Sequence, residues 1–422
     1  MSKYPRDNRP NLRPVNRIEL SEKNSRQRLI LVCLLVIIAA AAIGTGIHAA
    51  LEVQPGWNEI QAACDEPNYS REFHLLYDFS QTDGDASAVN KALSLLYSEA
   101  MENAYRIFSK DADVADFHNL YYLNRHVNEP VTLDETLYKA LALLQENGNR
   151  CMYLAPVYVE YNRVFNSESD VEAKLYDPTM DPQAQAYIGQ LMTYLTDTDA
   201  VNLQLLGNNQ VILSVSADYL AFAEENGIEE FVDLAWMRNA FVADYVAELL
   251  AEKGYVSGCI GSFDGYNRSL DRAGQLHFNI FDRQGTDIYA PGKMTYTGAM
   301  SIVFLRDYPL STQDQWSYHV YEDGRITSSL INPDDGIRPM AIANLVSYSA
   351  SASCAELLAE MTPVVFADAF SKDAVMELCR KGIYSIWCEA GTVHYNQENL
   401  QLDLLVNEQG VTYSKEFAGP AQ

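Results

Sequence analysis

The sequence predicts an α+β protein with one N-terminal transmembrane helix followed by a single large extracytoplasmic domain. An uncharged apolar run at residues 29–50 predicts the membrane span. Segments of helical and of strand periodicity are interspersed from 72 to 417, without the strict strand–helix–strand repeat of a parallel α/β fold. The same region has no internal repeat and no low-complexity break, so we expect one domain, or two tightly packed lobes.

The first 50 residues predict topology. Roughly 20 apolar residues at about 1.5 Å rise each match a hydrocarbon core of about 30 Å. Residues 1–28 carry eight Lys and Arg against three acidic residues, and the next Lys or Arg after the apolar run is Arg71. Because positive charge stays on the cytoplasmic side, we expect a cytoplasmic tail at 1–28 and an outward-facing body in the cell membrane.

The alternative for this segment is a cleaved signal peptide, with Ala49 and Ala50 near a small-residue cleavage site. Signal peptides usually have apolar regions of only about 7–15 residues, and this run is longer. An uncleaved anchor is therefore favoured. After it, residues 51–71 contain Pro55, Gly56 and Pro67 and are interpreted as a juxtamembrane linker.

The charge of the body excludes one class of partner. The chain has 30 Lys and Arg against 57 Asp and Glu, a net charge of −27. Without the basic tail, about −32 remains on the exported part. A surface of that sign repels nucleic acid phosphates, so a nucleic-acid function is set aside. The six cysteines outside the span include no Cys-x-x-Cys pair, so both disulfides and buried free thiols are open.

The elements of the body follow in order along the chain. The pattern predicts a strand at 73–78, a helix at 87–107, a helix after a capping box at Thr132–Glu135, and a helix at 237–253 that Gly254 ends. A strand at 255–260 and a β-rich region at 276–331 come next, with a hairpin turn at Asp323-Gly324. Helices at 354–361 and 372–380 and strands near 383–388 and 411–414 complete the pattern.

A series of short phrases has the order found in one known family. The C-terminal half supplies Val232-Asp233-Leu234-Ala235 before a helix, Gly258–Ser262, the turn Glu322–Arg325, the loop Ser329–Gly336 and the helix start Cys354–Ala359. Upstream, the matching phrases are Phe108-Ser109, Leu123-Asn124, Pro130–Glu135, Asn149-Arg150-Cys151 and Ala155-Pro156-Val157. Over about 73–404, this layout resembles the FAD:protein FMN transferase (ApbE) family.

The resemblance implies an exported flavin-handling domain that cleaves FAD with the help of Mg²⁺ and attaches FMN to membrane or exported proteins. It also implies flavin-binding positions at Asp233, Gly261, Asn332 and Gly336. Each has a simpler interpretation that stays open. Asp233 can cap the following helix, Gly261 can serve a tight bend, and the loop at 332–336 is a good turn sequence in its own right.

The departures from the family pattern concern its catalytic parts. The family's two metal-ligating positions, an Asp and a Thr, are occupied here by Cys354 and Leu358. A thiol and an isobutyl group cannot replace the oxygen ligands that Mg²⁺ requires. The family's loop aspartate, helix lysine and loop histidine are replaced by Cys151, Asn239 and Ser329. No catalytic residue and no metal ligand are therefore assigned.

Two functions compete for such a chain, and a purely structural ectodomain without a ligand is a weaker third. The first is a catalytically degenerate relative that binds a flavin nucleotide, FAD or FMN, or a membrane or exported protein partner. The alternative is a divergent, working Mg²⁺-dependent transferase whose oxygen ligands come from Asp334, Asp335 or Glu356. The first is favoured, because compensation would be needed at several positions at once. Whether the chain is an enzyme is left open.

Overall fold

A nine-stranded sheet forms the framework of the described protein. The computed structural model describes residues 55–419 apart from 83, 116 and 408–409. The strand order is β1-β2-β6-β7-β10-β13-β14-β15-β17, and neighbours are antiparallel except for the parallel pair β15–β17. The bounds are β1 Trp57–Ile60, β2 Phe73–Asp78, β6 Gly258–Ser262, β7 Tyr266–Ser269, β10 Met300–Arg306, β13 Asn344–Ser349, β14 Tyr384–Glu389, β15 Thr392–Tyr395 and β17 Ser414–Phe417.

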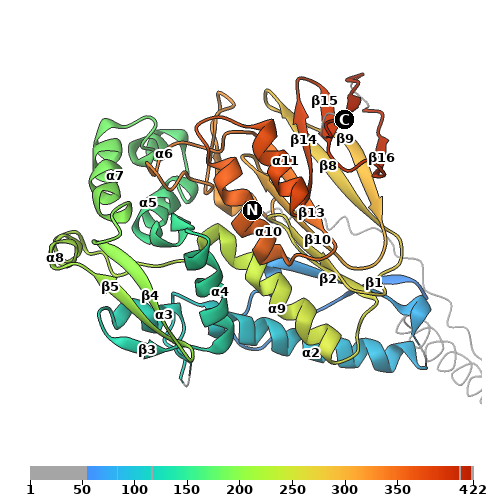
Figure 1. The fold of residues 1–422 in the computed structure, drawn as a ribbon, viewed down its shortest axis with the longest axis horizontal. Helices are drawn as coiled ribbons and strands as arrows, with labels where there is room; N and C mark the ends of the chain where they lie inside the picture. Colours follow the sequence, from blue (N-terminus) through green and yellow to red (C-terminus); the bar gives the residue numbers. More distant parts are fainter. Residues whose placement is uncertain (1–54, 83, 116, 408–409, 420–422) are drawn as a thin grey trace, which may run out of the picture. The chain divides into compact units, whose positions relative to one another are not determined.

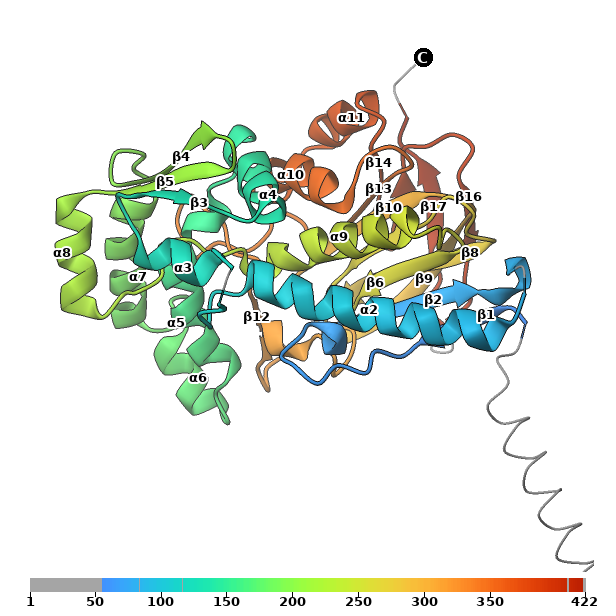
Figure 2. The same ribbon diagram turned by 90° about the horizontal axis from the view of Figure 1, so that it is seen from below.

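Both faces of this sheet are buried, because alternate residues of its central strands enter different cores. In β10, Val303 and Leu305 join the larger hydrophobic core, while Ile302 and Phe304 join the smaller one. The larger core includes the helices α2 (Ala86–Phe108), α9 (Arg238–Glu252), α10 (Cys354–Val365) and α11 (Lys372–Arg380). The smaller one includes a second sheet of order β16-β9-β8, formed by Gln401–Leu404, Asp287–Tyr296 and Leu276–Gln284. In Figure 2, α2 and α9 run across the front of the sheet.

The segment between α2 and α9 forms a second, mainly helical group beside the sheet (Figure 1). Its helices are α3 Leu120–Arg125, α4 Glu135–Glu146, α5 Ala155–Phe165, α6 Asp170–Tyr176, α7 Pro182–Leu195 and α8 Ala217–Asn226. A three-stranded sheet of order β3-β5-β4 belongs to this group, with bounds Pro130–Thr132, Gln210–Val215 and Val201–Gly207. A separate hairpin, β11 Tyr318–Val320 and β12 Ile326–Ser328, encloses the predicted turn at Asp323-Gly324.

The structure confirms most of the predicted elements and corrects the others. The strand predicted at 255–260 is β6 at Gly258–Ser262, and the strand predicted near 411–414 is β17, which begins only at Ser414. β2, α2, α9, α11 and β14 lie within a residue or two of the expected ranges, and α10 runs four residues further than predicted. The capping box at Thr132–Glu135 is wrong, because Thr132 ends strand β3 and Asp134 caps α4 by accepting a hydrogen bond from the Thr136 amide at 2.8 Å. The cysteines of the described region are all unpaired thiols.

The N-terminal predictions concern mostly residues outside the described part of the chain. The predicted cytoplasmic tail and membrane span lie outside the described residues. Among the helices that are described, none is both long and apolar enough to cross a bilayer. Part of the predicted linker at 51–71 is folded, since β1 pairs with β2 at the edge of the large sheet.

Candidate functional site

Asp233 lies on a buried turn that leads into α9. Its backbone amide donates to the Met152 carbonyl at 2.9 Å, and its Oδ1 accepts from the Ala235 amide at 2.9 Å. Ala235 has a φ of 41°, so the chain turns sharply here before the short 3₁₀ segment Ala235–Met237. The side chain therefore forms a local turn with the amide two residues on. It does not cap the following helix as the simpler interpretation expects, because neither the 3₁₀ segment nor α9 has a side-chain cap. Burial raises the pKa of Asp233, and the positive charge of Lys110 partly offsets that effect.

The same side chain also lines a cavity of about 120 Å³, which we call the Asp233 cavity. Six aromatic residues that are far apart in sequence line it: Tyr69, Phe108, Tyr158, Phe165, Trp236 and Trp316. Lys110, Asp111, Arg238 and Ser329 add polar groups to the lining. Ser329, at the position where the family pattern has a histidine, thus lines the same cavity as Asp233.

Both cations of the cavity are paired with carboxylates. Lys110 Nζ lies 2.9 Å from Glu230 Oε2 and 3.2 Å from Asp111 Oδ1. Arg238 forms an ion pair with Glu72, and its guanidinium stacks over the Tyr69 ring at 4.1 Å. Asn239, at the family's lysine position, donates to Glu72 at 3.0 Å and to Asp264 at 2.9 Å. Burial, reinforced by the Glu72 charge, raises the pKa of Asp264 to about 6.

Gly261 does not line the Asp233 cavity. It lies in β6, where a Cβ atom would come within 2.3 Å of Asn267 Oδ1 and within 2.7 Å of the His74 ring. Glycine leaves room there for two neighbouring side chains that cross over the strand, and a larger residue would displace them. The geometry thus gives Gly261 a packing role, away from the lining of the Asp233 cavity.

Asn332 and Gly336 form a tight loop apart from that lining. Asn332 Oδ1 accepts from the Asp334 amide and its Nδ2 donates to the Phe366 carbonyl, each at 2.8 Å. Gly336 has a φ of 69°, and a Cβ there would meet Ile188 and Met192 at 2.9 Å. Both positions are explained by the turn and by its packing against α7 and α10. Of the four predicted positions, only Asp233 lines the cavity.

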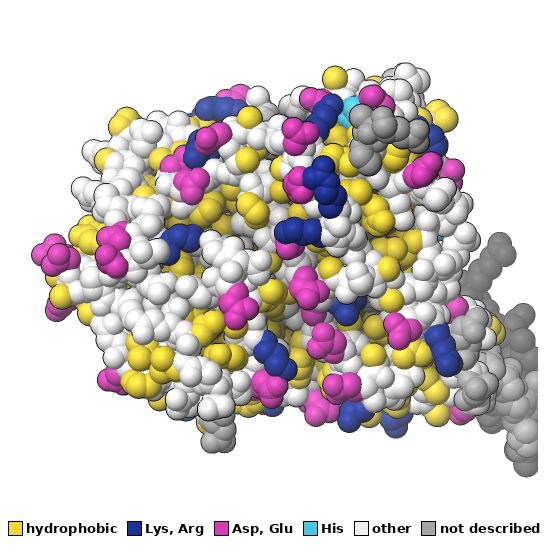
Figure 3. All heavy atoms as spheres, viewed as in Figure 1, with side chains coloured by type: hydrophobic (Ala, Val, Ile, Leu, Met, Phe, Trp, Pro, Cys, Tyr) yellow, Lys and Arg dark blue, Asp and Glu magenta, His cyan; other side chains and the backbone are white. Residues whose placement is uncertain are grey.

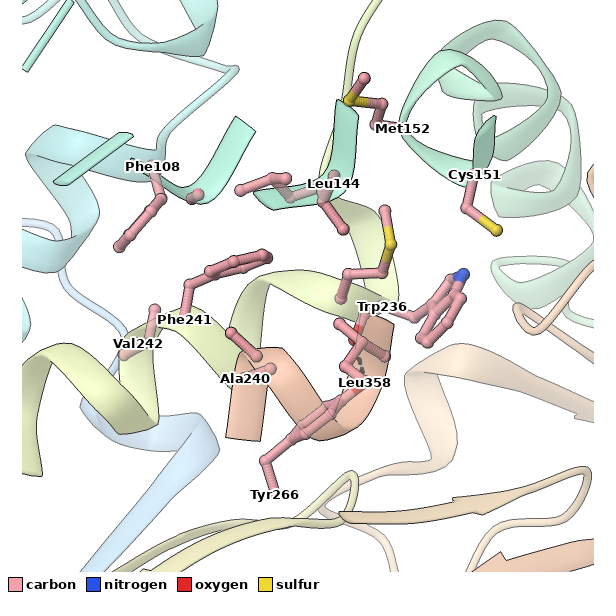
Figure 4. Packing of buried hydrophobic residues seen from close by; sticks show 14 of the residues in the cluster. Phe108, Leu144, Cys151, Met152, Trp236, Ala240, Phe241, Val242, Tyr266 and Leu358 are labelled. Carbon is pink, nitrogen blue, oxygen red and sulfur yellow. Dashed lines mark hydrogen bonds between the residues drawn. The ribbon is translucent and has the colours of Figure 1, made fainter. Parts of the chain in front are cut away.

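The positions that the family uses for metal lie in the core. Cys354 and Leu358 are both 0% exposed. Figure 4 shows Leu358 among the side chains of Trp236, Ala240 and Tyr266. In place of a metal, the start of α10 binds a carboxylate of the chain, because Asp244 accepts from the amides of Cys354 and Ala355 at 3.0 and 2.8 Å. Arg268 neutralises that carboxylate at 2.8 Å.

The donor chemistry around α10 does not fit Mg²⁺. Burial raises the pKa of the Cys354 thiol well above its usual value, so the sulfur stays protonated, and Leu358 has no donor atom. Cys151, at the position of the family's loop aspartate, is also fully buried. Across the described part of the chain, no group of three or more His, Cys, Asp or Glu side chains is arranged to hold a metal ion.

Sequence reasoning missed several residues of this site. Lys110, Glu72 and Arg238 carry no motif, and the Lys110–Glu230 contact joins positions 120 residues apart. Arg238 directly precedes Asn239, which stands at the family's lysine position. A basic residue next to that position is the one signal in the sequence that could have indicated Arg238. Asp244 lies in the middle of the amphipathic helix α9, where a single acidic residue carries no sequence signal of a site.

Known structures share this architecture, although no family model and no curated protein sequence matches the chain. The flavin transferase ApbE of Vibrio cholerae superposes with a TM-score of 0.53 at 12% identity, covering 83% of this chain and 97% of that one. The ApbE protein of Thermotoga maritima has a TM-score of 0.52 at 13% identity, covering 78% and 94%. The fold is thus that of a class of flavin transferases. More particularly, it is a divergent ApbE-like fold, as the order of the sequence phrases predicts.

Proposed function

We propose that this chain is a membrane-anchored, extracytoplasmic ApbE-like domain that binds a flavin nucleotide or a protein partner and has lost transferase chemistry. The observation that carries the proposal is the burial of Cys354 and Leu358 in the core. Phosphoryl transfer depends on metal and cationic groups that neutralise developing charge. Here the metal-ligand positions are packed with sulfur and carbon, and the helix lysine is replaced by Asn239, which bonds to two carboxylates.

The working transferase is the second candidate, and two of its three substitute oxygen ligands, Glu356 and Asp335, are already engaged. Glu356 accepts from the Ser353 amide at 2.7 Å in a true capping box. Asp335 accepts from the amides of Ile337 and Arg338 and also pairs with the Arg338 side chain. Asp334 is exposed and lies 3.9 Å from the same arginine. Recruiting these carboxylates to a metal would break a helix cap and a loop, which favours the degenerate domain.

One assay separates these functions. The full-length chain in detergent is incubated with FAD and Mg²⁺, separated from free ligand, and analysed for bound flavin and for AMP. We expect retained flavin without AMP if the ligand is a flavin, and neither product if the partner is a protein. AMP release above a protein-free control would contradict the proposal and favour the working enzyme.

The membrane anchor rests on the residues before the described domain. The apolar run at 29–50 and the basic segment before it support a single span with the body outside. The even spread of acidic and basic side chains over the face in Figure 3 is consistent with a solvated body. A C-terminal tag should be digested by protease added to intact cells, and a protected tag would reverse the orientation.

A further inference from the structure

The Asp233 cavity is small for a nucleotide. Its volume of about 120 Å³ is below the roughly 300–1,000 Å³ of typical small-molecule sites. It is close to the roughly 150 Å³ of an engineered protein cavity that binds benzene. Its aromatic walls suit a planar ring, since offset or edge-to-face ring contacts are favourable. The cavity therefore has room for one six-membered ring, and the rest of a larger ligand must remain outside it.

Two polar groups in the lining are available to such a ring. The Ser329 hydroxyl is buried, and within the described residues it has no hydrogen-bond partner. Its position is fixed, because the Ser329 amide donates to the Ser317 carbonyl at 2.9 Å. The hydrogen bond to Asp233 uses Oδ1, which leaves Oδ2 as an acceptor. Leaving a buried hydroxyl without a partner destabilises the protein, and a ligand that bonds to the hydroxyl removes that cost.

The charges around the cavity oppose a phosphate. Asp111, Asp233, Glu72 and Glu230 are the carboxylates that line the cavity or pair with its cations. They face two cations, Lys110 and Arg238, so the region is negative overall when all groups are ionised. Both cations already have carboxylate partners. A phosphate group at the mouth would have to displace those partners or be repelled by them.

We infer that the Asp233 cavity receives the uncharged imide edge of a flavin ring, and that the site prefers flavins without phosphate over FMN and FAD. This inference rests on the flavin-binding half of the proposed function. An imide edge presents an N–H beside a C=O, which matches the free acceptor of Asp233 and the hydroxyl of Ser329. The aromatic walls then contact the ring, and the ribityl chain points to solvent.

The test is a titration of the full-length chain in detergent, without Mg²⁺, followed by quenching of tryptophan fluorescence, since Trp236 and Trp316 line the cavity. Riboflavin is expected to bind at least tenfold more tightly than FMN or FAD. The 3-methyl derivative of riboflavin lacks the imide N–H, and we expect it to bind at least fivefold more weakly than riboflavin. The substitutions Ser329→Ala and Asp233→Asn should each weaken riboflavin binding at least fivefold. The matched control is Ser328→Ala, because Ser328 is equally buried but lines a different pocket.

Each contrary outcome has a distinct meaning. FMN or FAD binding as tightly as riboflavin would overturn the preference while leaving flavin binding intact. Equal binding of the 3-methyl derivative would overturn the imide contact. If no flavin binds to a chain that melts cooperatively, both this inference and the flavin half of the proposed function fail. AMP release from FAD is a separate readout, and it contradicts only the loss of transferase chemistry.

Discussion

Replacing Asp314 by alanine is expected to lower the free energy of unfolding by about 3–5 kcal/mol, the usual cost of removing one partner of a buried ion pair. Asp314 and Arg306 are 0% and 1% exposed in their side chains and form an ion pair. Asp314 also accepts from the amides of Leu310 and Ser311, at 3.0 and 2.8 Å. Without that carboxylate, the guanidinium of Arg306 would stay buried with no anionic partner. The backbone carbonyls of Phe263, Asp264 and Phe304 would remain as its acceptors in the described structure.

Chemical denaturation followed by circular dichroism measures this effect. The matched control is Asp323→Ala, which removes an ion pair with Arg325 that is more than half exposed. That variant should leave the denaturation midpoint unchanged. Replacing Arg306 by Met together with Asp314 by Leu should recover much of the loss, because no charge then remains buried. A midpoint for Asp314→Ala equal to that of Asp323→Ala would show that the buried pair is not formed.

The Asp314 substitution should also affect the candidate site. The segment that Asp314 holds continues into Trp316 and Ser317, which line the Asp233 cavity. Ser317 in turn accepts from the Ser329 amide. The ion pair is therefore a positioning element for one wall of the cavity.

Restoring the family's metal ligands is expected to destabilise the protein in the absence of metal. Replacing Cys354 by Asp and Leu358 by Thr should cost about 3–5 kcal/mol, from the lost burial of leucine and from a second buried carboxylate beside Asp244. Positions i and i+4 share a helix face, so the two new oxygens can approach one Mg²⁺. We expect 10 mM Mg²⁺ to recover part of the loss, as a rise in melting temperature in this double variant.

A pair of substitutions that adds no carboxylate supplies the control for that experiment. Cys354→Ser with Leu358→Val changes both positions without adding a carboxylate. This variant should be mildly destabilised and indifferent to Mg²⁺. An equal Mg²⁺ response in both double variants would show that the ion acts elsewhere on this acidic chain. Little transferase activity is expected even in the restored variant, because Asn239 and Ser329 still lack the cation and the imidazole of the family pattern.

The sequence predicted the fold better than the site, for physical reasons. Local periodicity placed α2, α9 and β2 correctly, because each presents one apolar face to a core. The order of short phrases predicted the ApbE-like fold even at 12–13% identity. The capping box failed because Thr132 and Asp134 are both good caps, and only strand pairing of Thr132 with Gln210 decides between them.

The chemistry of the site was beyond the reach of sequence, because it depends on contacts across the fold. Gly261 and Gly336 look alike as motif glycines, and only the neighbours of their missing Cβ atoms show that both are packing positions. Lys110, Glu230 and Asp233 meet through loops with no local signal. The unpartnered hydroxyl of Ser329 is a property of three-dimensional packing alone.

The most direct test of the central claim is the melting temperature of the unmodified full-length chain with and without Mg²⁺, in the presence of FAD. A ligand at 100 times its Kd stabilises a protein by about 2.7 kcal/mol, which is readily seen in a melting curve. Because Cys354 and Leu358 are buried in the core at the positions that the family uses for metal, no oxygen ligand is available there. We therefore predict no Mg²⁺-dependent shift of the melting temperature beyond that given by the same ionic strength of NaCl. A specific rise of several degrees would show that other residues hold the metal, and it would contradict the account of a domain without its catalytic metal site.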